Sequence, residues 1–146
     1  DRVFALRAGV ARARAAAQNI IPTTTGATLA AAEAVPELKG LFTGLAIRVP
    51  TIVGSLSDFT FLFKRETTVE EVNKIFTDEA QSERYKNILE VTTEPIVSSD
   101  IIGNPCSSIV DLSLTQVVGG NLLKVIAWYD NEWGYANRLV EEVVLV

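Results

Sequence analysis

The sequence predicts an α+β domain in which a mixed, mainly antiparallel sheet has helices packed on one face. Two observations carry this prediction. Segments with strand patterns outnumber those with helical patterns, and the strands of the second half follow one another through short, hairpin-type connections. The 146 residues suffice for one domain with a hydrophobic core. We therefore expect a single domain over residues 1–146.

The first third of the chain predicts two helices and one strand. Residues 3–18 are rich in alanine and arginine, which are good helix formers. Turn residues at 22–26 break the chain before a second helix over 27–35, which Pro36 helps to end. The apolar segment 41–50 then reads as a strand closed by a proline.

Residues 66–83 form the clearest predicted helix, because an apolar stripe recurs there at helical spacing. Thr67 with Glu70 makes one capping box at its start. Thr68 with Glu71 makes an alternative one.

The segment before this helix, residues 55–63, alternates like a strand and carries apolar groups on both of its faces. Phe59, Phe61 and Phe63 share one face. One small layer of helices need not cover this much apolar surface, and an exposed apolar sheet face is typical of a partner surface. We therefore expect self-association through the sheet, or a lost partner that once covered it.

The second half predicts three strands and a final helix. Residues 87–95 read as a short strand, and residues 107–118 and 121–130 as two longer strands joined by a turn at Gly119 and Gly120. Residues 136–146 place apolar side chains at i, i+3, i+4, i+7 and i+8, which predicts a helix packed on the sheet.

Composition excludes several classes of function. The net charge of −5 argues against non-specific binding of nucleic acid. No apolar run approaches the roughly 20 residues that span a bilayer, and no signal peptide is visible, so we expect a cytoplasmic protein. The chain has no histidine and no methionine, which we interpret as hints of an edited or excised sequence. The acidic residues read as a solvated face and not as a metal site; they are Asp78, Glu79, Glu83 and Glu90.

Several long phrases follow one another in an order that resembles one protein family. They are ARARAAAQNIIPTTTGA, PELKG, FTGLAIRVPT, KRETTVEEVN, EPIVSSDIIGNP, SSIVD and VGGNLLKVIAWYDNEWGYANRLV. From Ala11 onward the chain thus resembles the C-terminal, catalytic domain of phosphorylating glyceraldehyde-3-phosphate dehydrogenase. The resemblance implies an α+β unit with a large mixed sheet, in agreement with the prediction from the residue pattern.

The resemblance also implies two groups of binding residues. In the family, two arginines and a threonine–glycine pair bind the phosphate groups of substrate and inorganic phosphate, since guanidinium, hydroxyl and backbone N–H groups all donate to phosphate oxygens. The matching positions are Arg12, Thr25, Gly26 and Arg48.

Within the phrase YDNEWGYANR, Asn131 resembles the asparagine that contacts the nicotinamide carboxamide, and Tyr135 resembles the tyrosine beside the ring. Structural alternatives stay open for both groups. Thr25 and Gly26 also fit a helix start, and Asn131 and Tyr135 also fit an ordered turn between a strand and a helix.

The family's chemistry needs parts that this sequence lacks. The nucleophilic cysteine of a phrase like SCTTN, the partner histidine and the GxGxxG of the Rossmann half have no counterpart here. The single cysteine, Cys106, has no histidine beside it and reads as a packing thiol. We therefore expect no catalytic residue and no cofactor of the chain's own, although the parent family uses NAD.

Some stretches also depart from the family pattern. FALRAGVA replaces a loop like LLDAPHKDLRR, and the aromatic-rich IVGSLSDFTFLF replaces PNVSVVDLTV. We expect an excised or engineered domain that stands alone without catalysis and self-associates through its sheet face. Two alternatives stay open: a fragment of an NAD-dependent dehydrogenase that needs a separate nucleotide-binding half, and a module that binds a protein or, weakly, an anion such as phosphate.

Overall fold

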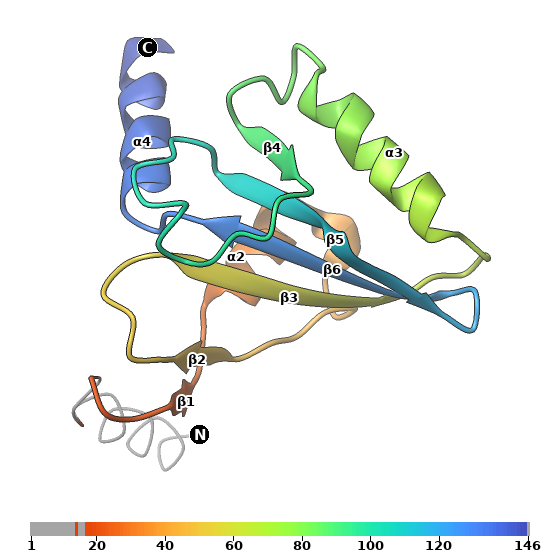
Figure 1. Ribbon diagram of the computed structural model, residues 1–146, viewed down its shortest axis with the longest axis horizontal. Helices are drawn as coiled ribbons and strands as arrows, with labels where there is room; N and C mark the ends of the chain where they lie inside the picture. Colours follow the sequence, from red (N-terminus) through yellow and green to blue (C-terminus); the bar gives the residue numbers. More distant parts are fainter. Residues whose placement is uncertain (1–13, 15–16, 146) are drawn as a thin grey trace. The chain divides into compact units, whose positions relative to one another are not determined.

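The computed structural model describes residue 14 and residues 17–145, and these belong to two compact units. The first unit ends at Ile52 and the second begins at Val53. The predicted helix over 3–18 falls almost wholly outside the described residues, as does Arg12. Figure 1 shows the elements of each unit, which are described separately below.

The first unit contains a two-stranded antiparallel sheet and a helix. Its elements are β1 (Ile21–Thr23), α2 (Ala27–Ala34), the 3-10 turn η1 (Pro36–Leu38) and β2 (Ala46–Arg48). The predicted helix is confirmed as α2. The predicted break at residues 22–26 is wrong at its start, because Pro22 lies within β1 opposite Ile47. A two-stranded sheet has only edge strands, where a proline is tolerated.

The second unit is built on a four-stranded sheet with the strand order β3-β6-β5-β4. Its elements are β3 (Ser55–Leu62), α3 (Val69–Ala80), β4 (Leu89–Thr92), β5 (Ser108–Val118), β6 (Leu122–Tyr129) and α4 (Trp133–Leu145). β6 pairs antiparallel with both β3 and β5, whereas β4 pairs parallel with β5. The predicted mixed, mainly antiparallel sheet and its strands are therefore confirmed.

The hairpin between β5 and β6 turns at the two predicted glycines. Gly119 and Gly120 have φ angles of 61° and 78°, which residues other than glycine rarely adopt. Val118 pairs with Leu122 directly beyond this turn. The turn thereby fixes which side chains of β6 face which side of the sheet.

One face of the sheet forms the main core against α3, and we call it the α3 face. Val72 of α3 packs there among Leu123, Val125 and Ala127 of β6, and all four side chains are buried. The phenylalanines of β3 lie on this face, as predicted, with Phe59 and Phe61 stacked at 5.8 Å between ring centroids. Apolar alternation on β3 and β6 thus builds a core that one helix covers.

The opposite face, which we call the second face, is covered at one end only. Ile101 and Cys106, from the loop between β4 and β5, are buried there with Ile109 of β5. At the other end, Leu62, Leu122 and Val118 form one row across three strands, and they are 75%, 40% and 60% exposed. The second face therefore offers apolar surface beside the hairpin.

The helix predicted over 136–146 is present as α4, but its predicted packing on the sheet is wrong. Its apolar stripe, Leu139, Val140, Val143 and Val144, is 52–78% exposed. Figure 1 shows α4 rising from the end of β6, beside the sheet and not across it. Its early turns are held instead, because Arg138 donates to the Asn87 carbonyl at 3.0 Å.

The register of β6 buries Leu123 and leaves its neighbour Leu122 partly exposed. Leu123→Ala should lower the free energy of unfolding by about 2–5 kcal/mol, because it leaves a cavity in the α3 face. Leu122→Ala, on the second face, should change it by roughly 0.5 kcal/mol. Urea unfolding of both variants measures the difference, and equal losses would contradict the assigned faces.

Candidate nicotinamide and phosphate site

Asn131 and Tyr135 lie at the junction of β6 and α4, and both side chains are exposed. The amide oxygen of Asn131 accepts hydrogen bonds from the backbone N–H of Gly54 at 3.1 Å and from the Ser55 hydroxyl at 3.2 Å. Tyr135, in the first turn of α4, is 69% exposed. The junction thus presents an amide and an aromatic ring toward the outside of the unit.

Asp130, directly before Asn131, holds this junction in place. The carboxylate is buried and accepts from the backbone N–H groups of Gly103, Glu132 and Trp133 at 2.8–2.9 Å. These hydrogen bonds, the one from Gly103 first, lower the pKa of Asp130 below its usual value. Asp130 therefore caps α4 and also ties its start to the loop between β4 and β5.

Two further polar or aromatic side chains near this junction, those of Asn137 and Trp128, make hydrogen bonds within the fold. Asn137 donates from its amide to the Trp133 carbonyl at 2.8 Å, within α4. Trp128 donates from its indole N–H to the buried carboxylate of Asp111 at 3.2 Å. Trp128 is also packed against the buried cluster of Ile101, Cys106 and Ile109, so it serves as a core anchor.

The predicted phosphate residues that the structure describes lie in the first unit. The Thr25 hydroxyl accepts from the backbone N–H of Ala27 at 3.1 Å, and Gly26 is the first flanking residue of α2. Arg48 is exposed at the end of β2 and pairs with Ile21, so it lies at the end of the ladder away from Thr25. The two-stranded sheet by itself does not bring the arginine and the threonine together.

Cys106 is buried beside the carboxylate of Glu90. Burial raises the pKa of the Cys106 thiol, and the negative charge of Glu90 raises it further. A thiol in this environment stays protonated near neutral pH and is a poor nucleophile. The geometry favours the reading of a packing thiol.

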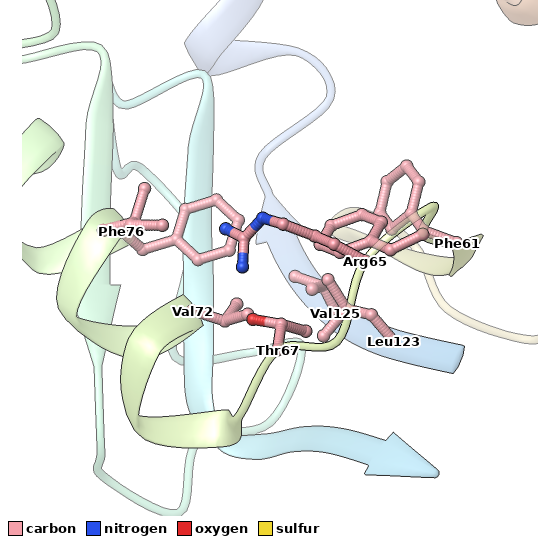
Figure 2. Close-up of a pocket in the computed structure, with 9 residues that line it drawn as sticks. Phe61, Arg65, Thr67, Val72, Phe76, Leu123 and Val125 are labelled. Atoms are coloured by element: carbon pink, nitrogen blue, oxygen red, sulfur yellow. The ribbon is translucent and has the colours of Figure 1, made fainter. Parts of the chain in front are cut away.

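An apolar groove of about 230 Å³ lies between α3 and the strands β3 and β6. Figure 2 shows Phe61, Leu123 and Val125 on its strand side and Val72 and Phe76 on its helix side. None of the predicted site residues lines this groove.

Arg65 at the edge of the groove is paired with Glu71 of α3. Two guanidinium nitrogens donate to the two carboxylate oxygens of Glu71 at 2.7 and 3.1 Å, and the Thr67 hydroxyl donates to Glu71 at 2.7 Å. These hydrogen bonds, the ones from Arg65 first, lower the pKa of Glu71 to about 2. The capping box predicted for Thr68 and Glu71 also forms in part, since the Thr68 hydroxyl accepts from the Glu71 N–H at 3.2 Å.

Comparison with known proteins places the chain in a family. The family model described as the C-terminal domain of glyceraldehyde 3-phosphate dehydrogenase matches residues 4–131. The chain belongs to this family. The chain is 53% identical over 135 residues to the glyceraldehyde-3-phosphate dehydrogenase of Streptomyces coelicolor. The aligned region covers 92% of the chain and 40% of that relative.

Other relatives match the same part of the chain to a similar degree. The glyceraldehyde-3-phosphate dehydrogenase of Mycobacterium avium is 52% identical over 92% of the chain. Glyceraldehyde-3-phosphate dehydrogenase 2 of Synechocystis sp. is 50% identical over the same share of the chain. The chain spans about 40% of the length of the curated relatives it matches.

The described residues also bear on metal binding and on membrane insertion. Among residue 14 and residues 17–145, no group of three or more His, Cys, Asp or Glu side chains is arranged to hold a metal ion. Within the same residues, no helix is long and apolar enough to cross a membrane.

Three residues of the junction escaped the sequence analysis. Asp130 had a local signal, because an aspartate directly before a helix is a common cap. Gly54 and Ser55 had none, since they lie 77 and 76 residues from Asn131 in the sequence. Only the pairing of β3 with β6 brings them together.

The lowered pKa of Glu71 predicts a pH dependence of stability. Its stabilisation is present above the unfolded value of about 4.5 and is lost as the pH falls through the folded value of about 2. Glu71→Gln should therefore be less stable than the parent at pH 7 and should approach it toward pH 2. The urea unfolding midpoints of the parent and of Glu71→Gln, measured at intervals from pH 7 to pH 2, give this difference in stability.

Glu83→Gln is the matched control, because no hydrogen bond or ion pair of the Glu83 side chain is found in the described part of the chain. It should follow the parent at every pH. A Glu71→Gln curve that runs parallel to the parent throughout would exclude the proposed contribution.

Proposed function

We propose that this chain is the catalytic-domain half of a phosphorylating, NAD-dependent glyceraldehyde-3-phosphate dehydrogenase. We also propose that it does not catalyse this reaction on its own. It would need a nucleotide-binding half that supplies the nucleophilic cysteine, the histidine and the dinucleotide site. Family membership supports the first part of this proposal. The raised pKa of the Cys106 thiol supports the second, because the only cysteine of the chain is poorly suited to attack a carbonyl.

The exposed apolar stripe of α4 is the observation that carries the proposal. A helix whose apolar side chains face solvent in its own unit has the pattern of an element that docks on another surface. Residues 133–138, at the start of the helix, are instead held against their own unit by Asp130 and Arg138. We infer that the later turns, with Val140 and Val143, contact the nucleotide-binding half.

The residues at the base of α4 suit a nicotinamide group. The amide nitrogen of Asn131 has no hydrogen-bond partner among the described residues and is available to a carboxamide, and the exposed Tyr135 ring offers a flat apolar surface. Bound NAD would supply the hydride acceptor. Asn131 would orient the carboxamide, and Tyr135 would shield one side of the ring from water.

The phosphate groups would be met by the first unit. Arg48 is exposed and makes no ion pair with another described residue, so its forked donors are available to a phosphate. The start of α2 at Gly26 adds backbone N–H groups and the positive end of the helix dipole. Binding of inorganic phosphate by Arg12, Thr25, Gly26 and Arg48 stays a prediction.

Complementation tests the proposed function. The chain alone should not reduce NAD with glyceraldehyde 3-phosphate and phosphate. Addition of the separately expressed nucleotide-binding half of a relative should produce a complex and measurable NADH formation. Val143→Asp should weaken this complex at least about tenfold, because it places a charge in the docking stripe.

Glu142→Asp is the control for this experiment, since it changes a neighbouring exposed residue that is already charged. It should leave complex formation unchanged. Turnover by the chain alone, or no association with any nucleotide-binding half, would rule out the proposal.

We also propose that the chain self-associates through the second face of its sheet. The exposed row of Leu62, Leu122 and Val118 favours this, and so does the ion pair between Asp58 and Lys124 on the same face, where Lys124 donates to Asp58 at 2.7 Å. A face with apolar groups around one charged pair can match a second copy of itself about a two-fold axis. An excised or engineered origin stays a prediction.

Light scattering over a protein dilution series measures the self-association. The parent chain should give a dimer or a larger closed species that persists on dilution, and Leu62→Asp should give a monomer. Ile75→Asp, which changes an exposed apolar residue on α3, should leave the mass unchanged. A monodisperse parent monomer at every concentration would contradict the second proposal.

A further inference from the structure

Asn131 makes two hydrogen bonds to one short segment, at the start of β3. Both the Gly54 N–H and the Ser55 hydroxyl donate to the same atom, the amide oxygen of Asn131, at 3.1 and 3.2 Å. The segment lies next to Asn131 because Ser55 pairs with Tyr129 as the first pair of the β3–β6 ladder.

The Gly54 N–H settles which way the Asn131 amide is turned. A backbone N–H can only donate, so the atom that faces it must be the amide oxygen and not the amide nitrogen. The amide nitrogen is then the atom left for a ligand, and no partner for it is found within residues 17–145. Asn131 therefore offers a donor and not an acceptor.

Gly54 occupies a position where close packing leaves no room for a side chain. Its φ angle is +92°, and a side chain at this position would come within 2.8 Å of the Ser98 carbonyl oxygen and 3.2 Å of the Ile101 side chain. Ile101 belongs to the loop between β4 and β5 and is buried with Ile109 of β5. A side chain at position 54 would therefore disturb this packing and move the N–H, so glycine is required to hold this donor against the Asn131 amide.

We propose that Gly54 and Ser55 are positioning residues that turn Asn131 so that its N–H group meets the carbonyl oxygen of a nicotinamide carboxamide. This inference rests on the proposed function for the identity of the ligand. Ser55 acts through Asn131 and does not touch the ligand. Its hydroxyl, together with the Gly54 N–H, occupies the amide oxygen and so keeps the amide from rotating.

Two forms of the dinucleotide distinguish a donor from an acceptor at Asn131. The 3-acetylpyridine analogue of NAD keeps the carbonyl oxygen and has a methyl group in place of the carboxamide NH₂. If Asn131 offers an N–H, NAD and the analogue should bind the parent complex within about threefold of each other, because both keep the acceptor. If Asn131 offered its oxygen, the analogue would bind about tenfold or more weakly, which would overturn the inference.

The variants are measured in the chain assembled with a nucleotide-binding half. Asn131→Asp keeps an acceptor for Gly54 and Ser55 but loses the donor, so it should weaken both dinucleotides about tenfold or more. Ser55→Ala should weaken both about threefold, and Ser55→Thr, which keeps the hydroxyl, should restore binding. Ser57→Ala, two residues along the same strand, should have no effect, and an equal effect of Ser55→Ala and Ser57→Ala would contradict a positioning role.

A measurement on the chain alone separates the orientation from the proposed function. The backbone amide resonance of Gly54 should shift in Asn131→Ala and stay near its parent position in Asn131→Asp. No shift in Asn131→Ala would overturn the assigned orientation, whatever the assembled complex binds. The expected shift in Asn131→Ala would support the assigned orientation of the Asn131 amide. If the parent complex then forms but binds neither dinucleotide, the ligand assignment and the proposed function would both be overturned.

Discussion

The antiparallel pairing of β6 with β3 and β5 is the constraint on which the second unit depends. β6 lies in the interior of the sheet, so its register sets the inward and outward side chains of both neighbours. Leu123, Val125 and Ala127 thereby meet α3, while Leu122 and Lys124 face the other side. A shift by one residue would bury the charge of Lys124 and expose the core, at a cost of many kcal/mol.

The same pairing also builds the candidate nicotinamide site. β6 ends where β3 begins, and this brings the segment of Gly54 and Ser55 to the residues that follow β6. Asp130 then caps α4 and holds the Gly103 N–H, so the junction is fixed from three segments of the chain. A buried carboxylate with three backbone donors tolerates little movement, because each lost bond would leave a buried polar group without a partner.

The unit combines a well-packed centre with apolar surfaces that have no partner in their own unit. The α3 face closes a core, whereas the stripe of α4 and the hairpin end of the second face expose valine and leucine. This division fits the proposal that the chain docks on other surfaces, and the raised pKa of the Cys106 thiol fits a packing role for that residue. The proposed docking of α4 and the proposed self-association use different residues, so both can hold in one assembly.

The sequence by itself determined the helices and strands of the second unit and the family of this protein. Alternation over 55–63, the glycine pair at 119–120 and the capped apolar stripe of α3 are local signals, and each element formed as predicted. The family phrases likewise determined the membership that the comparisons show. Local patterns were sufficient because backbone preferences and the periods of strand and helix act over a few residues.

Only the tertiary structure decided where α4 goes and how Asn131 is turned. The stripe of α4 has the periodicity of a packed helix, yet the Asp130 cap and the Arg138 hydrogen bond direct it away from the sheet. The Asn131 amide is oriented by donors from 76 and 77 residues away, and no local pattern carries that information. Strand β1 was missed for the same reason, since its proline-containing segment becomes a strand only by pairing with β2. Periodicity tells which side of an element is apolar, whereas contacts between distant segments decide what that side meets.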